Sequence, residues 1–135
     1  MGKVIGIGGV FFKSQDPKKL QAWYEEHLGF QPDREGYVYF RWPKQARMDP
    51  NAYTLWGPFP SDTKYFGSTK QPLMINFVVD DLDLILKQLK SKGVEVDDRI
   101  EEHSEGRFGW FIDSEGNRTE LWEPPTTVSK KDLTE

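Results

Sequence analysis

The sequence predicts an α+β fold made of two copies of one βαβββ unit. One observation is a Leu-Trp-x-Pro stretch that occurs in residues 53–58 and again in residues 119–124. A second is the likeness of residues 9–16 to residues 74–81, each followed by a helical pattern that ends at a glycine. Both pairs are separated by roughly 65 residues, a spacing typical of an internal repeat. Because 135 residues are too few for two independent cores, we expect the copies to share one core.

The division of the chain follows from this repeat. We expect a single domain, with repeat one over about 4–58, a linker over 59–72, repeat two over about 73–125 and a charged tail over 126–135. Alternating apolar residues and turn residues mark the strands, and apolar residues at helical spacing mark the helices. The expected elements of repeat one are a strand over 3–14, a helix over 17–27 that ends at Gly29, a strand over 37–42, a polar loop over 43–50 and a strand over 52–56.

Repeat two is expected to have the same order of elements. Asp81 is placed to cap its helix, as Asp16 is in repeat one, where Pro17 occupies the first helical turn. The expected elements are a strand over 73–79, a helix over 82–92, a short strand over 94–96, a charged loop over 97–106 that holds the solvated His103, and a hairpin of residues 108–112 with 118–122.

The closing strand carries one carboxylate that is a candidate for a functional site, Glu120. On an alternating strand, Thr119 and Leu121 share one face, and Glu120 points the other way with Trp122. If Leu121 faces the core, then Glu120 and Trp122 face whatever lies opposite, which on this strand alone is either a site or solvent. Pro124 ends the strand.

Composition excludes several classes of protein. The chain has no cysteine, which excludes disulfides, thiolate metal ligands and a cysteine nucleophile. Its net charge of −4, with no basic stripe, argues against nucleic acid as a partner. No stretch is typical of a membrane span or a signal peptide, so we expect a cytoplasmic protein that does not bind membranes. Aromatic residues make up 14% of the chain, which suits the wall of a pocket or an interface.

The repeat resembles the vicinal oxygen chelate superfamily, which includes glyoxalase I, bleomycin and fosfomycin resistance proteins and extradiol dioxygenases. Three stretches carry the resemblance, which covers residues 5–125: residues 23–30, residues 77–82 and residues 113–124. The resemblance implies that the two βαβββ repeats form a curled mixed sheet around a central cavity. It also implies a homodimer and, in the enzymes of the family, a divalent metal in that cavity.

The same resemblance implies four metal-ligand positions. They fall on Gly9, Thr54, Met74 and Glu120. Only Glu120 is a metal ligand, and divalent ions such as Zn²⁺ take three or four protein ligands. We therefore expect no metal and no other cofactor, and the resemblance to glyoxalases and dioxygenases indicates the fold more strongly than the activity.

Without a metal, the predicted cavity has the character of a site for a planar organic ligand. Strand parity and the ligand positions of the family place its predicted lining residues beside Glu120, the one candidate catalytic residue: Phe11, Lys13, Thr54, Trp56, Met74, Asn76 and Trp122. The leading hypothesis is a small-molecule-binding protein of the glyoxalase and bleomycin resistance type. One alternative is a glyoxalase-like lyase or isomerase, or a dioxygenase-type enzyme, of the same superfamily, with Glu120 as a general base in the metal-free case. Another is an interaction module whose aromatic side chains fill the cavity.

Overall fold

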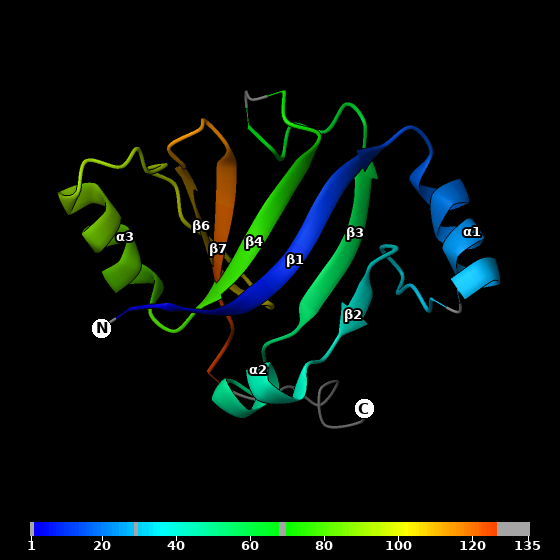
Figure 1. Ribbon diagram of the computed structural model, residues 1–135, viewed down its shortest axis with the longest axis horizontal. Coiled ribbons are helices and arrows are strands. Elements are labelled where there is room, and N and C mark those ends of the chain that lie inside the picture. Colours follow the sequence, from blue (N-terminus) through cyan, green and yellow to red (C-terminus); the bar gives the residue numbers. More distant parts are fainter. Residues whose placement is uncertain (1, 29, 68–69, 127–135) are drawn as a thin grey trace.

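The computed structural model describes residues 2–28, 30–67 and 70–126, and within them the strands form a seven-stranded mixed sheet. The strands lie in the order β2-β3-β1-β4-β7-β6-β5 (Figure 1). Their bounds are β1 Val4–Ser14, β2 Val38–Phe40, β3 Thr54–Pro60, β4 Leu73–Val79, β5 Glu101–His103, β6 Gly106–Ile112 and β7 Arg118–Glu123. The predicted α+β fold is confirmed.

The two repeats meet at the centre of the sheet, where β1 and β4 run antiparallel. Each of these strands has a parallel partner from its own repeat, because β3 pairs with β1 and β7 pairs with β4. The outer strands β2 and β6 then add on antiparallel, and β5 follows β6 at one edge. The first and last strands of each repeat therefore lie together in the middle of the sheet, which brings their side chains to one place.

Two helices, α1 (Pro17–Leu28) and α3 (Leu82–Ser91), lie at opposite ends of the sheet (Figure 1). Both begin as the sequence predicts. The carboxylate of Asp16 accepts a hydrogen bond from the backbone N–H of Lys19, and that of Asp81 accepts one from Leu84. Each cap satisfies a backbone donor that the first helical turn leaves without a partner.

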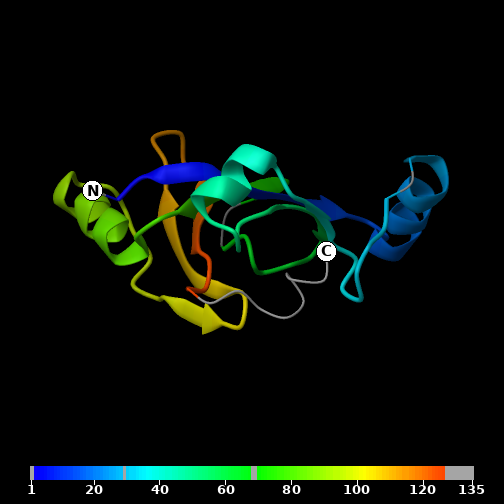
Figure 2. The ribbon, with the colours of Figure 1, turned by 90° about the horizontal axis from the view of Figure 1, so that it is seen from below.

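The helices α1 and α3 pack on the two ends of the outer face of the sheet and thereby show which side chains face inward. Leu82 and Leu86 of α3 pack against Leu121 of β7 and Val79 of β4. Because side chains alternate along a strand, burying Leu121 under α3 turns its neighbours Glu120 and Trp122 toward the inner face. Seen from below, the sheet curls into an open half-barrel around that inner face (Figure 2).

Aromatic side chains occupy much of the inner face. One cluster of buried residues contains Phe11, Phe66, Met74 and Trp110, and a second contains Ala52, Tyr53, Val78 and Trp122. Residues of both repeats and of the linker contribute to these clusters. The core on this side is therefore shared between the repeats, as their small size requires.

Three predicted element boundaries are wrong. Residues 43–50 are not a plain loop, because Pro43–Met48 forms helix α2, with proline in the first turn where it is tolerated. The charged segment 97–106 contains the edge strand β5, and charged residues are common on edge strands. Strand β3 begins at Thr54 and runs on through Pro60, since its parallel pairing with β1 continues past Gly57.

Other predictions have mixed outcomes. The short strand predicted over 94–96 is an isolated bridge between Val96 and Phe111. Gly29, the predicted end of α1, and residues 127–135 of the predicted tail lie outside the described residues. Among the helices that the structure describes, none is long and apolar enough to cross a membrane.

Candidate functional site

The inner face of the sheet contains a pocket of about 390 Å³. Its walls come from both repeats and from the linker between them, and most of the lining side chains are aromatic. The lining residues are Gly8, Phe11, Glu35, Tyr37, Tyr39, Tyr53, Leu55, Phe59, Tyr65, Asn76, Glu105, Phe108, Glu120 and Trp122. The aromatic side chains leave this volume open, which argues against the alternative in which they fill the cavity.

Glu120 lies at the base of this pocket and is only 1% exposed. Its neighbours in the sheet are Asn76 on β4 and Trp110 on β6, which stand directly opposite it in register. Directly opposite residues share a face of the sheet, so all three side chains point to the same side. The β-sheet register itself therefore places an amide and an indole against the carboxyl group.

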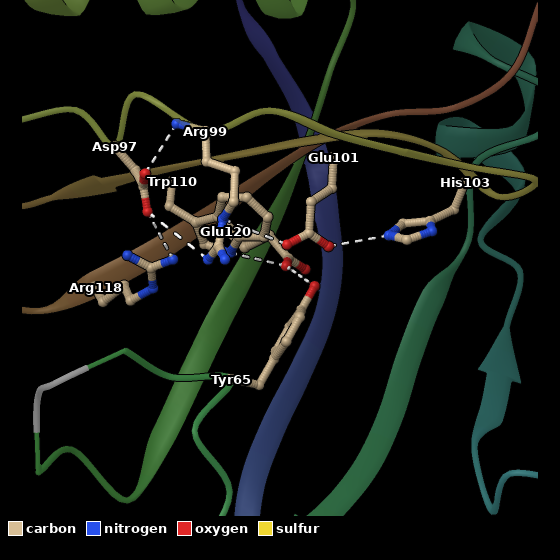
Figure 3. Close-up of polar contacts among 8 residues, drawn as sticks. All are labelled: Tyr65, Asp97, Arg99, Glu101, His103, Trp110, Arg118 and Glu120. Atoms are coloured by element: carbon tan, nitrogen blue, oxygen red, sulfur yellow. Dashed lines mark hydrogen bonds and ion pairs between the residues drawn. The ribbon is translucent and has the colours of Figure 1, made fainter.

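Three donors surround the carboxylate of Glu120. Asn76 Nδ2 donates to Oε1 over 2.6 Å, and Trp110 Nε1 donates to Oε2 over 3.0 Å. The hydroxyl of Tyr65, which comes from the linker, donates to Oε2 over 2.5 Å (Figure 3). Charge-assisted bonds of this kind hold a carboxylate in a single orientation.

Burial raises the pKa of Glu120 from 4.5 to about 7. The three hydrogen bonds oppose this rise, because they stabilise the charged form, and the nearby carboxylate of Glu101 adds to it. Burial and Glu120 together also raise the pKa of the Tyr65 phenol. Glu120 consequently exchanges a proton near neutral pH while Tyr65 stays a donor.

Asn76 carries an acceptor without a partner. Its Nδ2 is committed to Glu120, while the buried Oδ1 has no hydrogen bond among the described residues. This oxygen lies in the space that the missing side chain of Gly8 leaves open, since a Cβ on Gly8 would stand 1.9 Å from it. Gly8 and Asn76 both line the pocket, so the unpartnered acceptor belongs to the site.

The aromatic walls are arranged in near-parallel and tilted pairs. The rings of Tyr37 and Tyr65 stack on Phe59, with centroids 5.9 and 5.6 Å away. On the other side, Trp122 stacks with Phe108 at 6.3 Å and lies 4.7 Å from Tyr53. These distances are within the range of favourable aromatic pairs, so two groups of packed rings form aromatic surfaces in the lining of the pocket.

A charged layer supports the base of the pocket from behind. Two guanidinium groups lie over the ring of Trp110, with Arg99 at 5.3 Å and Arg118 at 5.1 Å from its centroid. Both guanidinium groups also contact Asp97 (Figure 3). The chain of contacts fixes the indole that donates to Glu120, so its position does not depend on the pocket wall alone.

Four of the predicted site residues meet in this pocket: Phe11, Asn76, Trp122 and Glu120. Met74 is fully buried beside it, within the cluster that also contains Phe11 and Trp110. Lys13 lies further along β1, with its ammonium 5.8 Å from the ring of Phe66, and does not line the pocket.

The predicted positions of Thr54 and Trp56 are wrong. Gly9 of β1 pairs with Leu55, so Leu55 shares its face, and the neighbours of Leu55 on β3 point to the outer face. Trp56 accordingly packs on Tyr24 at 5.0 Å, and Thr54 accepts a hydrogen bond from Trp42. A register error of one residue moves every side chain of a strand to the other face, and here it exchanged Leu55 for its neighbours.

Sequence reasoning missed several residues of the pocket. Tyr65 lies in the linker, where the sequence has no strand or helix periodicity that would show which way a side chain points. The tyrosines at 37, 39 and 53 lie in or next to β2 and β3. The sequence pattern there does not show which side chains face inward. Gly8 is the neighbour of Gly9, the position that the family resemblance indicated. The register of β1 is irregular between Ile7 and Gly9, and simple alternation therefore does not predict that Gly8 faces the pocket. The clustering of tyrosines between residues 37 and 65 was the one signal available.

The residues at the four family ligand positions do not fit a metal. Thr54 points to the outer face, and Met74 is enclosed in the core. A side chain at Gly9 has no room, since its Cβ would lie 2.7 Å from the ring of Phe11. Glu120 already accepts three hydrogen bonds. Within the described residues no group of three or more His, Cys, Asp or Glu side chains could hold a metal ion.

The fold and the chain can be compared with known proteins. Solved structures that resemble the chain include methylmalonyl-CoA epimerase from Mycobacterium tuberculosis, with 22% identity, a TM-score of 0.63 and coverage of 90% of this chain and 89% of that one. Another is a variant of the Streptomyces coelicolor methylmalonyl-CoA epimerase in complex with 2-nitronate-propionyl-CoA, with 18% identity, a TM-score of 0.66 and coverage of 92% and 100%. A third, described as an NAD-dependent benzaldehyde dehydrogenase from Legionella pneumophila, has 16% identity, a TM-score of 0.57 and coverage of 87% and 98%. At these identities the likeness concerns the fold.

Comparison with curated proteins found no significant match. A family model, by contrast, covers most of the chain: the model of the Glyoxalase/Bleomycin resistance protein/Dioxygenase superfamily matches residues 7–121. The match includes both repeats and Glu120, and it agrees with the curled sheet described above. The chain therefore belongs to the glyoxalase/bleomycin resistance protein/dioxygenase superfamily.

Proposed function

We propose that the protein binds a small, planar organic molecule in the pocket above Glu120, without a metal. The observation that carries this proposal is the convergence of two aromatic surfaces on a buried carboxyl group. A cavity of about 390 Å³ is within the range of small-molecule sites, which are mostly apolar and hold a few placed polar groups. Flat aromatic walls favour a flat ligand, because offset stacking needs two planar partners.

The ligand's ring would lie against Trp122 and Tyr53 or against the surface formed by Tyr37, Phe59 and Tyr65. The polar anchors would be Glu120 and the free Oδ1 of Asn76. The rest of the lining supplies shape, since its side chains are already packed against one another.

Ligand binding can be tested through the intrinsic fluorescence of the tryptophans. A library of planar aromatic compounds is expected to contain members that quench this fluorescence saturably, and Trp122→Ala should weaken their binding. The matched control is Trp56→Phe, which changes an indole on the outer face and should leave the affinity unchanged. Absence of any saturable quench across the library would contradict the proposal.

A second candidate function is proton transfer catalysed by Glu120. The specific observation in its favour is the pKa of about 7, because a general base works best when its pKa lies near the operating pH. The fold that the chain shares with methylmalonyl-CoA epimerases is compatible with an enzyme of this kind. It would be tested by solvent deuterium exchange into bound ligands, which Glu120→Gln should abolish while the ligands still bind.

We further propose that the chain forms a homodimer through the outer face of its central strands. Between α1 and α3, the helix that contacts β1 in the described part of the chain is the short helix α2, which lies near one end of the strand (Figure 1). Ile7, Val10 and Leu73 are 40%, 36% and 44% exposed there. Light scattering of the wild type and of Val10→Asp would test this, since the charged variant should be a monomer. A monomeric wild type would contradict it.

A further inference from the structure

We propose that the pocket selects organic cations, in particular planar aromatic rings that bear a permanent positive charge or a protonated amine. The inference rests on the proposed function, because it names the class of ligand for the same pocket. Three independent features of the lining support it: the sign of its charges, the faces of its rings and its unpartnered acceptor.

The charged side chains that line the pocket are all acidic. Glu35 and Glu105 lie at its exposed rim, and Glu120 lies at its base. No lysine, arginine or histidine is among the lining residues that the structure describes. Glu101 lies close enough to influence the Glu120 carboxyl. A negative potential in a partly enclosed cleft attracts cations and repels carboxylates and phosphates.

The two guanidinium groups that contact Trp110, below the base of the pocket, are paired with carboxylates. Arg118 is 9% exposed, and its guanidinium contacts Asp97 at 3.1 Å and the ring of Trp110. Arg99 contacts the same aspartate and also Glu101 at 3.5 Å. The carboxylates of Asp97 and Glu101 offset these two positive charges, so the charges do not cancel the acidic lining.

The walls present aromatic faces, which carry negative partial charge and bind cations. One of these rings already binds a cationic side chain in the structure. Arg41 places its guanidinium 5.0 Å from the centroid of Tyr53, one of the pocket walls. Tyr37 and Tyr65 flank the base of the same pocket. Several electron-rich rings around a small cavity, together with carboxylates, are the arrangement that recognises organic ammonium groups.

The buried Oδ1 of Asn76 adds a directional preference. The residue is 2% exposed, the oxygen lacks a partner, and its location against Gly8 keeps it in the pocket lining. An unpaired buried acceptor is unfavourable until a donor reaches it. The N–H of a protonated amine or a polarised C–H beside a ring nitrogen cation would supply that donor, whereas a carboxylate could not.

The inference can be tested with three probes of nearly equal shape. Calorimetric titration at pH 8, where Glu120 is largely ionised, would use the cation 1-methylquinolinium, its neutral isostere 1-methylnaphthalene and the anion naphthalene-1-sulfonate. We expect the cation to bind about tenfold more tightly than the neutral probe, which is the size of a desolvated cation–π contribution. We expect no measurable binding of the anion.

Rim variants provide a second readout. Glu35→Gln and Glu105→Gln keep the size of the side chain and remove its charge. Each should weaken binding of the cation by about two- to fivefold, as expected for exposed charges, and leave the neutral probe unchanged. The matched control is Glu115→Gln, an exposed carboxylate in the turn before β7 that does not line the pocket.

The outcomes separate this inference from the proposed function. If the neutral probe binds as tightly as the cation, or the anion binds best, the preference for cations is wrong and the aromatic binding site stands. If none of the three probes binds saturably, both the inference and the binding function are overturned. A tenfold preference that is insensitive to both rim variants would assign the selectivity to the rings, Asn76 and Glu120 and would overturn the role given to the rim.

Discussion

The hydroxyl of Tyr65 donates a hydrogen bond to Glu120 across 55 residues of sequence and joins the linker to β7, the last strand of the chain. Tyr65 also stacks on Phe59 with ring centroids 5.6 Å apart. The linker is therefore part of the pocket, and it stabilises the charged form of the carboxyl group at the base.

The first prediction concerns this hydrogen bond. Tyr65→Phe removes a donor that favours the ionised carboxylate, so the pKa of Glu120 should rise above its value of about 7. The indole N–H of Trp110 donates to the same oxygen and reports the titration by its NMR chemical shift. Tyr37→Phe is the control, since Tyr37 lines the pocket and its hydroxyl makes no hydrogen bond to Glu120 among those described. An unchanged midpoint in Tyr65→Phe would contradict the role of Tyr65.

The second prediction follows from the raised pKa of Glu120. Between pH 4.5 and about 7 the folded protein holds a proton that the unfolded chain has lost, so stability decreases as pH rises through this window. The stability that the protonated Glu120 contributes is fully present below pH 4.5 and is lost above about pH 7. Glu120→Gln mimics the protonated group and should lack this dependence.

The measurement is denaturant unfolding of both proteins across that range. The free energy of unfolding of the wild type, relative to Glu120→Gln, should fall by at most roughly 1.4 kcal/mol per pH unit. Parallel pH profiles for the two proteins would show that Glu120 titrates at its ordinary value.

Particular residues show how far the sequence predicts this site. Leu121 under α3 and Glu120 on the inner face follow from simple alternation, because β7 is regular and pairs on both sides. The face of strand β3 was predicted wrongly because the echo of Leu-Trp-x-Pro aligns Thr54 with Glu120. In the sheet, Asn76 pairs with Glu120, and the residue of repeat one equivalent to Asn76, Phe11, pairs with Gly57. A shift by an odd number of residues between the repeats is invisible in composition and reverses the face.

The positions of residues outside helices and strands could not be predicted from the hydrophobic pattern. Tyr65 reaches Glu120 only because the linker folds back over the inner face, and no local signal encodes that path. The helix α2 did have a signal, a proline in the first turn followed by good helix formers, which the polar character of the segment obscured.

The third prediction concerns the fit between Gly8 and Asn76. Gly8→Ala places a methyl group 1.9 Å from Asn76 Oδ1, so either the strand or the amide must move. We expect a loss of roughly 1–3 kcal/mol in the free energy of unfolding, as for other overpacked sites. Most of this loss should disappear in the Asn76→Ala background, where the oxygen is absent. Equal losses in both backgrounds, measured by chemical denaturation, would show that the amide is not the obstacle.

The fourth prediction is that the purified protein holds no stoichiometric divalent metal. Gly9 and Met74 offer no suitable ligand, Thr54 lies on the outer face, and Glu120 already accepts three hydrogen bonds. Elemental analysis after dialysis without chelator should therefore find far less than one ion per chain. About one Zn, Ni, Mn or Fe per chain, lost in Glu120→Gln, would contradict the assignment of the site.

The central claim is that a small aromatic molecule binds in the pocket above Glu120, and the five tryptophans provide a direct measurement of it. Each indole N–H gives a separate resonance in a ¹H–¹⁵N NMR spectrum, and single Trp→Phe variants assign them. Trp122 lines the pocket and donates to the backbone oxygen of Glu105, and Trp110 donates to Glu120 at the base of the pocket. Trp23, Trp42 and Trp56 do not line it. Titration with 1-methylquinolinium should shift the resonances of Trp110 and Trp122 saturably and leave the other three in place. Shifts confined to Trp23, Trp42 and Trp56, or no saturable shift at all, would contradict the account.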